Sequence, residues 1–368
     1  METVFWASAA LIAYVYAGYP LVLALWARVY RVRPGAPGGP DARVWPAAPI
    51  AEPAVSIVIA VRNEASRLRA KIENLLALDY SSERQIIVVS DGSTDSPEEA
   101  LAAAPANVEL VSVPALGKAL ALNAGVARAR HDIVVFADAR QAFAPDALRL
   151  LVAPFTDRRV GGVTGELVLD AECDGSAHAS QSALGDGVGL YWRYEKALRR
   201  FESTVGSTLG ATGAIYALRR AMWQPLPADT LLDDVLAPMR AVLDGHRVIF
   251  EDRAKAFDQA AVDAASETRR KIRTLAGNVQ ILWLEPRLLI PFVNPVWLQY
   301  VSHKLGRLLV PYALAALLGS SAWLARDHWL YAAAFVGQCG FYLLAAYGAW
   351  LAGMASTPSM AAGRGSEV

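Results

Sequence analysis

The sequence predicts an α/β protein with a mostly parallel sheet, helices on both faces of the sheet, and membrane-spanning helices at both ends of the chain. Three observations lead to this fold class. Continuous apolar runs of strand length alternate with helical segments between residues 55 and 137, which is typical of parallel strands buried on both faces. Long stretches without a charged residue lie near both termini. Hydrophobic residues make up 54% of the 368 residues, which is high for a soluble enzyme.

The two ends of the chain carry the predicted membrane helices. Val4–Ala27 has no charged residue and is longer than the roughly 20 residues that cross a bilayer core, so residues 1–33 are predicted to form the first transmembrane helix. The chain starts with Met-Glu rather than with basic residues, which argues against a cleaved secretory signal. Leu308–Ala325 and Trp329–Met354 predict a two-helix transmembrane hairpin within residues 305–356.

Basic residues next to these helices predict the orientation. Arg28, Arg31 and Arg33 follow the first helix, and Lys304 and Arg307 precede the hairpin. Because such residues are enriched on the cytoplasmic side, we expect the amino terminus outside and the middle of the chain inside. The sequence therefore predicts an integral protein of a bacterial-type inner or plasma membrane, in contact with membrane lipid, with a cytoplasmic central domain.

Three further segments flank that central domain. Residues 34–53 contain six prolines and three glycines and are predicted to be an extended linker. Residues 279–304 are apolar, are interrupted by prolines and carry tryptophans, so we expect an interfacial amphipathic segment. Residues 357–368 are predicted to be a disordered tail. This leaves residues 54–278 as the cytosolic domain.

Hydrophobic periodicity orders the elements of this domain. β-Branched residues predict a first strand at Val55–Ala60, and Leu68, Ile72 and Leu75 recur on one face of the helix that follows. The later expected strands are Ile86–Ser90, Val108–Val113 and Ile133–Ala137, and the later expected helices include Lys118–Arg128 and an amphipathic helix near residues 186–204.

Composition excludes several classes of function. The chain has 35 basic and 35 acidic residues, which gives no indication of nucleic-acid binding. The five histidines do not have the spacing of a zinc site, and two cysteines cannot form a disulfide framework.

Carboxylates follow two of the predicted strands. Asp91-Gly-Ser-Thr-Asp95 follows the run Ile86–Val89, and Asp138 follows Ile133–Phe136. Open α/β sheets bind ligands outside the carboxyl ends of their strands, so these side chains are candidate ligand contacts. The carboxylates of Asp91 and Asp95 suit the hydroxyls of a ribose and the edge of a base. The alternative is that this motif makes a turn and caps the next helix.

Lys118 follows Gly117 at the predicted start of a helix. A cation and a helix amino terminus would meet a phosphate together at this position. The alternative is a solvated surface lysine. A phosphate loop of the nucleotide-hydrolase kind is not expected, because the sequence has no Gly-x-x-x-x-Gly-Lys-Ser/Thr motif.

A series of motifs along the chain carries a resemblance to a known family. The motifs are Ser56–Glu64, Asp91–Asp95, Gly117-Lys118 with Asn123, Asp138-Ala-Arg140, Thr212-Gly213 and Asp233-Asp234. This series resembles that of family 2 glycosyltransferases over Val55–Arg273. The flanking helices make the chain similar to the membrane-embedded branch, which includes cellulose, chitin, hyaluronan and poly-N-acetylglucosamine synthases and ceramide glucosyltransferase. The resemblance implies a GT-A-type, Rossmann-like domain and inverting transfer of a hexose or N-acetylhexosamine from a UDP-sugar to a lipid-linked or polysaccharide acceptor.

The resemblance also implies the donor contacts and the cofactor. Asp138 would hold Mg²⁺ or Mn²⁺ against the diphosphate, since a hard cation accepts one protein carboxylate together with phosphate oxygens. Family members usually present Asp-x-Asp where this chain has Asp138-Ala-Arg140, so Arg140 either contacts the diphosphate or pairs with a nearby acid. The other expected donor-binding residues are Ala60, Arg62, Glu64, Asp91, Asp95 and Lys118.

Arg270 and Arg273 lie where family members commonly show Gln-x-x-Arg-Trp. They would clamp the diphosphate. The alternative is that this basic cluster binds acidic lipid headgroups. The Gln and the Trp of the family motif are both missing here, and the missing Trp favours transfer of one sugar over repeated extension.

The remaining motifs concern the chemistry and the acceptor. Displacement at an anomeric carbon needs a base for the acceptor hydroxyl. By the resemblance, Asp234 is that base and Asp233 supports or orients it, the alternative being an exposed acidic loop. Tyr191 and Trp192 offer aromatic surface for a sugar acceptor, with Thr212 and Gly213 as a small-residue turn beside them, although such aromatics equally suit a core or an interface.

The sequence thus predicts a glycosyltransferase with a UDP-sugar donor and a lipid or glycan acceptor. Three membrane helices are few for a polysaccharide channel, so partner subunits or a homo-oligomer are expected for polymer export. The altered Asp138-Ala-Arg140 and basic motifs leave one alternative from a different class: a catalytically inactive membrane scaffold or nucleotide-sugar sensor.

Overall fold

The computed structural model of the 368-residue chain describes residues 1–32, 52–169, 183–258 and 264–355. Most of the predicted linker 34–53 and the predicted tail 357–368 lie outside the described residues. The chain divides into two compact units. One comprises Met1–Gly18 and the chain from Gly306 onward, and the other comprises Tyr19–Leu305.

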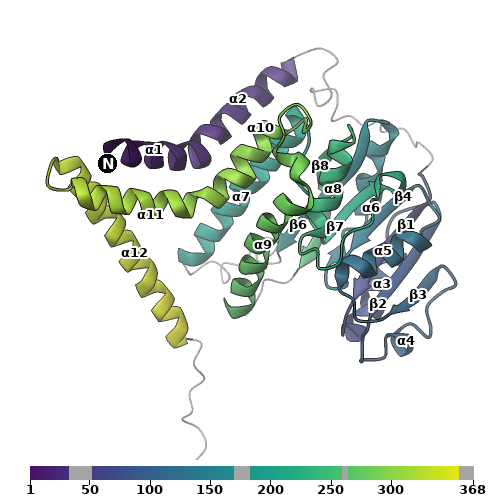
Figure 1. Cartoon of the computed structure of the whole chain (residues 1–368). Coiled ribbons are helices and arrows are strands. Elements are labelled where there is room, and N and C mark those ends of the chain that lie inside the picture. The colour runs from purple at the N-terminus through teal and green to yellow at the C-terminus, as the bar shows by residue number, and fades with distance from the viewer. Residues whose placement is uncertain (33–51, 170–182, 259–263, 356–368) are drawn as a thin grey trace, which may run out of the picture. The chain divides into compact units, whose positions relative to one another are not determined.

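The larger unit is built on one mixed sheet of eight strands among the described residues (Figure 1). Four strands, β3-β2-β1-β4, run parallel to one another, as the sequence predicts. The sheet continues as β7-β6-β8-β5, where β7 is antiparallel to both of its neighbours and β6 pairs parallel with β8. The strands are β1 (Val55–Val61), β2 (Arg84–Asp91), β3 (Val108–Val113), β4 (Ile133–Ala137), β5 (Ala142–Phe143), β6 (Val160–Leu169), β7 (Ile215–Arg219) and β8 (Arg247–Asp258).

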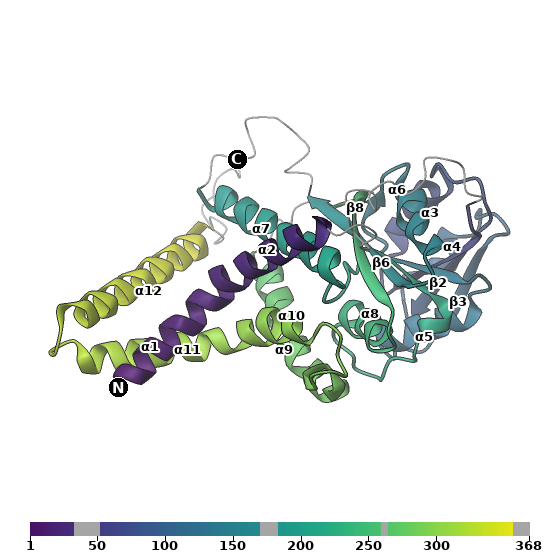
Figure 2. The same ribbon diagram turned by 90° about the horizontal axis from the view of Figure 1, so that it is seen from above.

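Helices cover both faces of this sheet, because the central strands are apolar on both sides. The buried side chains of α3 (Ala65–Leu76) and α6 (Ala147–Val152) pack on one face, around Ile57 and Val135. Those of α5 (Lys118–Arg128) and α8 (Asp233–Leu243) pack on the other, around Val58 and Phe136. Figure 2 shows these two layers on opposite sides of the strands.

The remaining helices of this unit surround the second half of the sheet. The predicted amphipathic helix near residues 186–204 is confirmed as α7 (Ala183–Val205), and α2 (Tyr19–Val32) packs along it through Leu23 and Leu198, both buried. The other elements are α4 (Pro97–Ala100), α9 (Ala264–Leu284), α10 (Trp297–Gln299), a π-helical turn at Tyr300–Leu305, and 3-10 turns at Ala153–Thr156, Arg220–Met222 and Pro286–Leu289.

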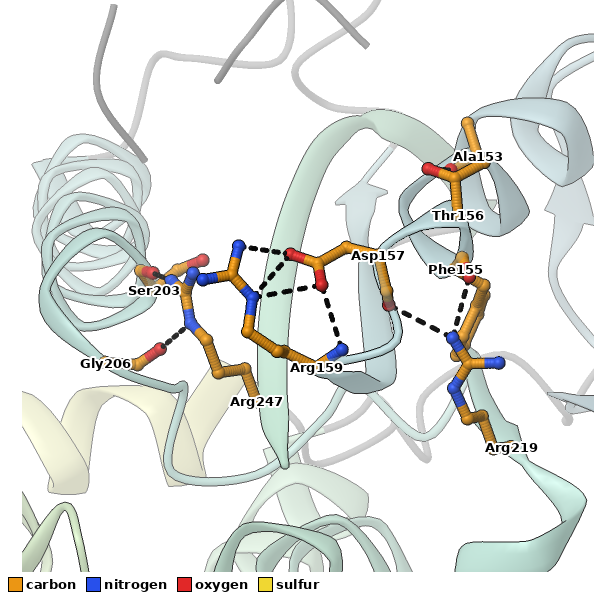
Figure 3. Close-up of polar contacts among 9 residues, drawn as sticks. All are labelled: Ala153, Phe155, Thr156, Asp157, Arg159, Ser203, Gly206, Arg219 and Arg247. Carbon is orange, nitrogen blue, oxygen red and sulfur yellow. Dashed lines mark hydrogen bonds and ion pairs between the residues drawn. The ribbon is translucent and has the colours of Figure 1, made fainter. Parts of the chain in front are cut away.

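Three arginines, Arg159, Arg219 and Arg247, brace one end of the sheet, and we call them the sheet-end arginines. Figure 3 shows how their guanidinium groups point at backbone carbonyls and at one carboxylate. Arg219 donates to the carbonyls of Phe155, Asp157 and Val160, Arg247 donates to those of Ser203 and Gly206, and Arg159 pairs with the Asp157 carboxylate at 2.8 Å. Arg219 and Arg247 therefore each hold two segments together, whereas Arg159 pairs within its own turn.

The smaller unit consists of helices. It contains α1 (Glu2–Ala13), a π-helical turn at Tyr14–Gly18, α11 (Gly306–Leu324) and α12 (Trp329–Ala355). The rings of Phe5 and Tyr331 meet edge to face with centroids 4.9 Å apart, and Leu324 is buried with them.

Within the described residues, three helices are long and apolar enough to cross a membrane: Glu2–Tyr30, Trp297–Leu324 and Trp329–Leu351. This agrees with the predicted number of membrane helices, and by the length and composition of these helices the chain is a membrane protein. The second helix begins earlier than the charge-free stretch Leu308–Ala325, because the π-helical turn that carries Lys304 continues into it. The predicted interfacial segment 279–304 is thus divided between the end of α9, a proline-rich turn and the start of this helix.

Candidate active site

A cleft of about 330 Å³ lies at the carboxyl ends of the parallel strands. It brings together most of the donor-binding residues that the sequence predicts. The lining residues are Ala60, Val61, Arg62, Glu64, Asp91, Lys118, Asp138, Arg140, Gln141 and Arg273. Asp95 and Arg270 do not belong to this lining.

The turn after β2 fixes the position of Lys118. The Asp91 carboxylate accepts hydrogen bonds from the backbone N–H groups of Leu116 and Gly117, at 2.8 and 3.0 Å. Gly92 has a φ of 60° and its missing Cβ would lie 2.7 Å from Ala115, so only glycine fits this turn. The two loops are thereby held together, and α5 begins at the cleft with Lys118.

Asp95, a predicted donor contact, has a hydrogen-bond partner within the protein. Its carboxylate accepts a hydrogen bond from the backbone N–H of Ala65 at 2.7 Å, at the start of α3. Asn63 is bonded to Ser93 at 3.1 Å and to Thr94 at 2.9 Å in the same pair of loops. The structure therefore realises the turn-and-cap alternative for Asp95, although the helix that it caps is α3 rather than the next one.

Lys118 lies between the Asp138 carboxylate, which lines the cleft, and the buried carboxylate of Asp233. Its ammonium nitrogen is 3.1 Å from Asp138 Oδ1 and 3.6 Å from Asp233 Oδ2. Burial lowers the pKa of Lys118, but the carboxylates of Asp233, Asp138 and Asp234 outweigh it and raise the pKa. Lys118 is therefore a fixed positive charge, and the alternative of a solvated surface lysine is wrong.

Asp233 and Asp234 form the first turn of α8. Asp233 is buried, and the side chain of Asp234 lies against Gly213, where an added Cβ would come within 3.1 Å of Asp234 Oδ2. Burial and the neighbouring charge of Asp233 raise the pKa of Asp234 to about 6, against the opposing effect of Lys118 and Lys304. A carboxylate tuned in this way suits proton transfer near neutral pH, and the pair is not an exposed acidic loop.

Arg140 is held at the rim of the cleft by an acid that sequence reasoning missed. Its guanidinium lies 2.5 Å from the Asp258 carboxylate, which also accepts a hydrogen bond from Gln141 at 2.9 Å. The ion-pair alternative for Arg140 is thus realised, and because Arg140 also lines the cleft, contact with a diphosphate stays a prediction. Asp258 ends β8, so recognition of that strand would have been needed to find this carboxylate from the sequence.

Lys71 is a second residue that the sequence did not single out. It is buried in α3, donates a 2.7 Å hydrogen bond to the Gln141 carbonyl and lies 4.2 Å from the centre of the Phe143 ring. Burial lowers the pKa of Lys71 to about 7, against the charge of Asp138. Lys71 thus supports the segment that carries Asp138 and Arg140.

The predicted acceptor residues fall into two places. Thr212 and Gly213 lie beside Asp234, since the Thr212 hydroxyl accepts a 2.8 Å hydrogen bond from Arg199 and Gly213 contacts the Asp234 carboxylate. Tyr191 and Trp192 lie on α7 outside the lining of the cleft, and Tyr191 is exposed.

The oxygen ligands of the cleft fit a divalent cation that is shared with the donor. The Asp138 side chain is 38% exposed and faces the cleft. Across the part of the chain that the structure describes, no three His, Cys, Asp or Glu side chains are arranged to hold a metal by themselves. Asp138 would therefore hold the ion together with phosphate oxygens. When bound, such a cation neutralises charge on a leaving diphosphate.

The strand order of the sheet, with acids and cations gathered at its carboxyl edge, agrees with a GT-A fold. The chain is similar to the structure of a mannosyltransferase from Pyrobaculum calidifontis in complex with GDP-Man and Mn²⁺, with a TM-score of 0.68, 24% identity and 94% of each chain covered. This likeness concerns the fold. Residues 56–223 match the family model "Glycosyl transferase family 2", so this part of the chain has the sequence of a family 2 glycosyltransferase domain.

Curated relatives point to the same family. The chain is 23% identical over 239 residues to poly-beta-1,6-N-acetyl-D-glucosamine synthase of Staphylococcus aureus (strain COL), covering 62% of this chain and 55% of that relative. It is 22% identical over 236 residues to the enzyme of the same name from Staphylococcus epidermidis, with the same coverage. The chain therefore spans about half the length of these relatives.

Proposed function

We propose that this protein transfers a sugar from a UDP-sugar to a lipid-linked or polysaccharide acceptor at the membrane, with inversion at the anomeric carbon. The observation that carries the proposal is the convergence of Lys118, Asp138 and the Asp233-Asp234 pair at one edge of the sheet. The names of the relatives support N-acetylglucosamine as the first sugar to test.

The proposed donor site is the cleft. Its nucleoside end would be formed by Glu64 and Asp91, whose loops are tied together. Its diphosphate end would be formed by Lys118 and Arg140, with Arg273 reaching in from α9. Cations held by buried acids are preorganised for phosphate oxygens, because their positions do not depend on the ligand.

The proposed base is Asp234. An acceptor oxygen forms the new bond to the anomeric carbon as the bond from that carbon to the diphosphate oxygen breaks, and the acceptor proton passes to Asp234. Its raised pKa of about 6 is close to working pH, as efficient base catalysis requires. Asp233, engaged by Lys118, would orient this first turn of α8.

We also propose that the cleft faces the cytoplasm. The structure has three candidate membrane helices, and basic side chains such as Arg28 lie at the carboxyl end of the first of them. Nucleotide sugars are cytoplasmic compounds, so a donor site on this side would be supplied directly. A cysteine placed after Arg33 is expected to resist a membrane-impermeant thiol reagent in intact cells and to react after permeabilisation.

The test is release of nucleoside diphosphate by the detergent-purified protein from UDP-N-acetylglucosamine, UDP-glucose and GDP-mannose, with Mg²⁺, with Mn²⁺ and with neither. Asp234→Asn is expected to lower kcat about 10²- to 10⁴-fold while donor binding persists. The matched control is Asp244→Asn, at the other end of α8, which should keep normal kcat. Donor binding without turnover under every condition would favour the scaffold or sensor alternative.

A further inference from the structure

A buried polar cluster lies on α7 beside the proposed base. The Glu202 carboxylate, 1% exposed, accepts a 2.9 Å hydrogen bond from the Tyr19 hydroxyl and lies 2.6 Å from His303 Nδ1. The other ring nitrogen, Nε2, is 3.6 Å from Glu195 Oε2. His303 therefore engages both carboxylates of this face of α7.

Arg199 and Lys304 lie in the same cluster, but neither forms a salt bridge with a carboxylate among the described residues. Arg199 falls between Glu195 and Glu202 on the same face of α7, and Lys304 directly follows His303. Among the residues that the structure describes, neither the Arg199 guanidinium nor the Lys304 ammonium has a carboxylate oxygen within 4.0 Å. Both side chains are half-buried. Two like charges at close quarters repel each other unless an anion joins them.

This pair of cations adjoins the base. Arg199 donates a 2.8 Å hydrogen bond to the hydroxyl of Thr212, and at the next residue, Gly213, an added Cβ would come within 3.1 Å of Asp234 Oδ2. Lys304 lies close enough to Asp234 to help to keep its pKa down. The cations therefore flank the acceptor side of Asp234, whereas Lys118 flanks the donor side.

Resting on the function proposed above, we propose that Arg199 and Lys304 form a subsite for the phosphate group of a lipid phosphate acceptor. Phosphate suits this pair because guanidinium and ammonium groups are the usual protein partners of its oxygens. The lipid is argued from the elements that build the cluster. Lys304 lies on the candidate membrane helix Trp297–Leu324, and Tyr19 lies on the candidate helix Glu2–Tyr30. An ionisable residue in an apolar helix typically marks a substrate path.

The chemistry balances with this acceptor. One phosphate oxygen forms a bond to the anomeric carbon, the bond from that carbon to the donor diphosphate breaks, and the nucleoside diphosphate leaves. When the acceptor arrives as the monoanion, its remaining proton passes to Asp234. The product is a lipid-linked sugar phosphate.

The experiment measures release of nucleoside diphosphate in the presence of three probes at equal concentration. Farnesyl phosphate carries both lipid and phosphate, farnesol carries the lipid alone, and inorganic phosphate carries the charge alone. We expect farnesyl phosphate to raise the rate and to form farnesyl sugar phosphate, and the other two probes to leave the rate unchanged. Equal stimulation by farnesol would overturn the inference.

Substitutions test whether Arg199 and Lys304 themselves bind the acceptor. Arg199→Met and Lys304→Met are each expected to raise the KM for farnesyl phosphate about tenfold or more, with Arg199→Lys and Lys304→Arg recovering part of the loss. Arg200→Met is the matched control, because Arg200 is the next residue on α7 and pairs with Asp252 instead. An unchanged KM in both methionine variants would contradict the subsite.

A binding measurement keeps this inference separate from the proposed function. Calorimetric titration of the purified protein with farnesyl phosphate should show binding that the double methionine variant lacks, whether or not any donor turns over. Binding without turnover of any donor would count against the proposed function alone. Turnover in which farnesyl phosphate neither binds nor reacts would count against the subsite alone.

Discussion

Two sets of cations in the catalytic unit differ in what surrounds them. The sheet-end arginines Arg219 and Arg247 donate hydrogen bonds to backbone carbonyls, and Arg159 forms an ion pair with the Asp157 carboxylate (Figure 3). Arg199, in contrast, meets only a neutral hydroxyl in the described structure. The comparison teaches that the number of basic residues in a region says little about binding. A cation whose hydrogen bonds go to the protein's own backbone stabilises the fold, whereas Arg199, which has no acid in contact among the described residues, is one of the two cations that we propose bind a substrate.

The largest expected effect on activity concerns Lys118, a cation of the cleft that is paired with acids. Lys118→Met should lower kcat/KM about 10²- to 10³-fold, because a preorganised positive charge near the leaving diphosphate is lost. Steady-state kinetics with the preferred donor measure this. Lys196→Met, whose salt bridge to Glu166 lies in another groove, should retain normal kinetics. Equal loss in both variants would mean that the effect is not local.

The sheet-end arginines should show the opposite pattern. Arg219→Met leaves several part-buried carbonyls without a donor, so we expect a loss of roughly 3 kcal/mol in the free energy of unfolding. The kcat per folded molecule should stay near normal. Thermal unfolding in detergent, read beside kcat, tests this, with the exposed Arg158→Met as the control. A normal melting temperature with reduced kcat would break the comparison.

The pH dependence of the two regions should also have opposite signs. The folded pKa of Asp234 is raised to about 6, so its stabilising contribution is present at low pH and is lost as pH rises through about 6. Asp157 has its pKa lowered by hydrogen bonding to Arg159, so its contribution is present at neutral pH and is lost under acid.

Activity follows the deprotonated form of Asp234. We expect kcat/KM to fall about tenfold for each pH unit below about 6. A pH-rate profile between pH 4.5 and 8 measures this limb. Asp157→Asn should not change the fall in kcat/KM at low pH. If the residual activity of Asp234→Asn still falls in the same way, a group other than Asp234 causes that fall.

The smallest expected effect concerns Arg140, whose acid partner Asp258 is buried behind the lining of the cleft. Asp258→Asn should raise the KM for the donor roughly tenfold or less, because Arg140 keeps its charge but loses its fixed direction. Donor titration of the variant, beside the surface control Asp252→Asn, measures the change. A KM equal to that of the native protein would show that Asp258 does not position Arg140 for the donor.

The first half of the sheet could be predicted because three of its four strands, β1, β2 and β4, are mostly buried and all four contain apolar runs. Val108–Val113, Lys118–Arg128 and Ile133–Ala137 have the predicted bounds, since each apolar run begins and ends at a polar residue or a turn. The strand Arg247–Asp258 was missed. Its buried and exposed positions alternate irregularly and its sequence is rich in charge, so no continuous apolar run marked it.

The candidate site could be predicted where it depends on strand ends, and not where it depends on distant pairs. The cleft contains Asp91 and Asp138 because the carboxyl ends of neighbouring parallel strands meet. Nothing local shows that Asp95 would bond to Ala65 or that Asp258 would reach Arg140, because those pairs are 30 and 118 positions apart in the chain. Arg199 and Lys304 likewise belong to elements whose proximity only the fold determines.

The burial of Glu202 also bears on which part of the chain can be produced alone. The compact catalytic unit extends from Tyr19 to Leu305, and both ends of that range place a polar side chain on Glu202. A water-soluble fragment cut at residues 54 and 278 would remove both partners and leave a carboxylate in an apolar wall, where Leu198 would also lose its cover from α2. The smallest fragment expected to fold is therefore one that keeps parts of two membrane helices and requires detergent.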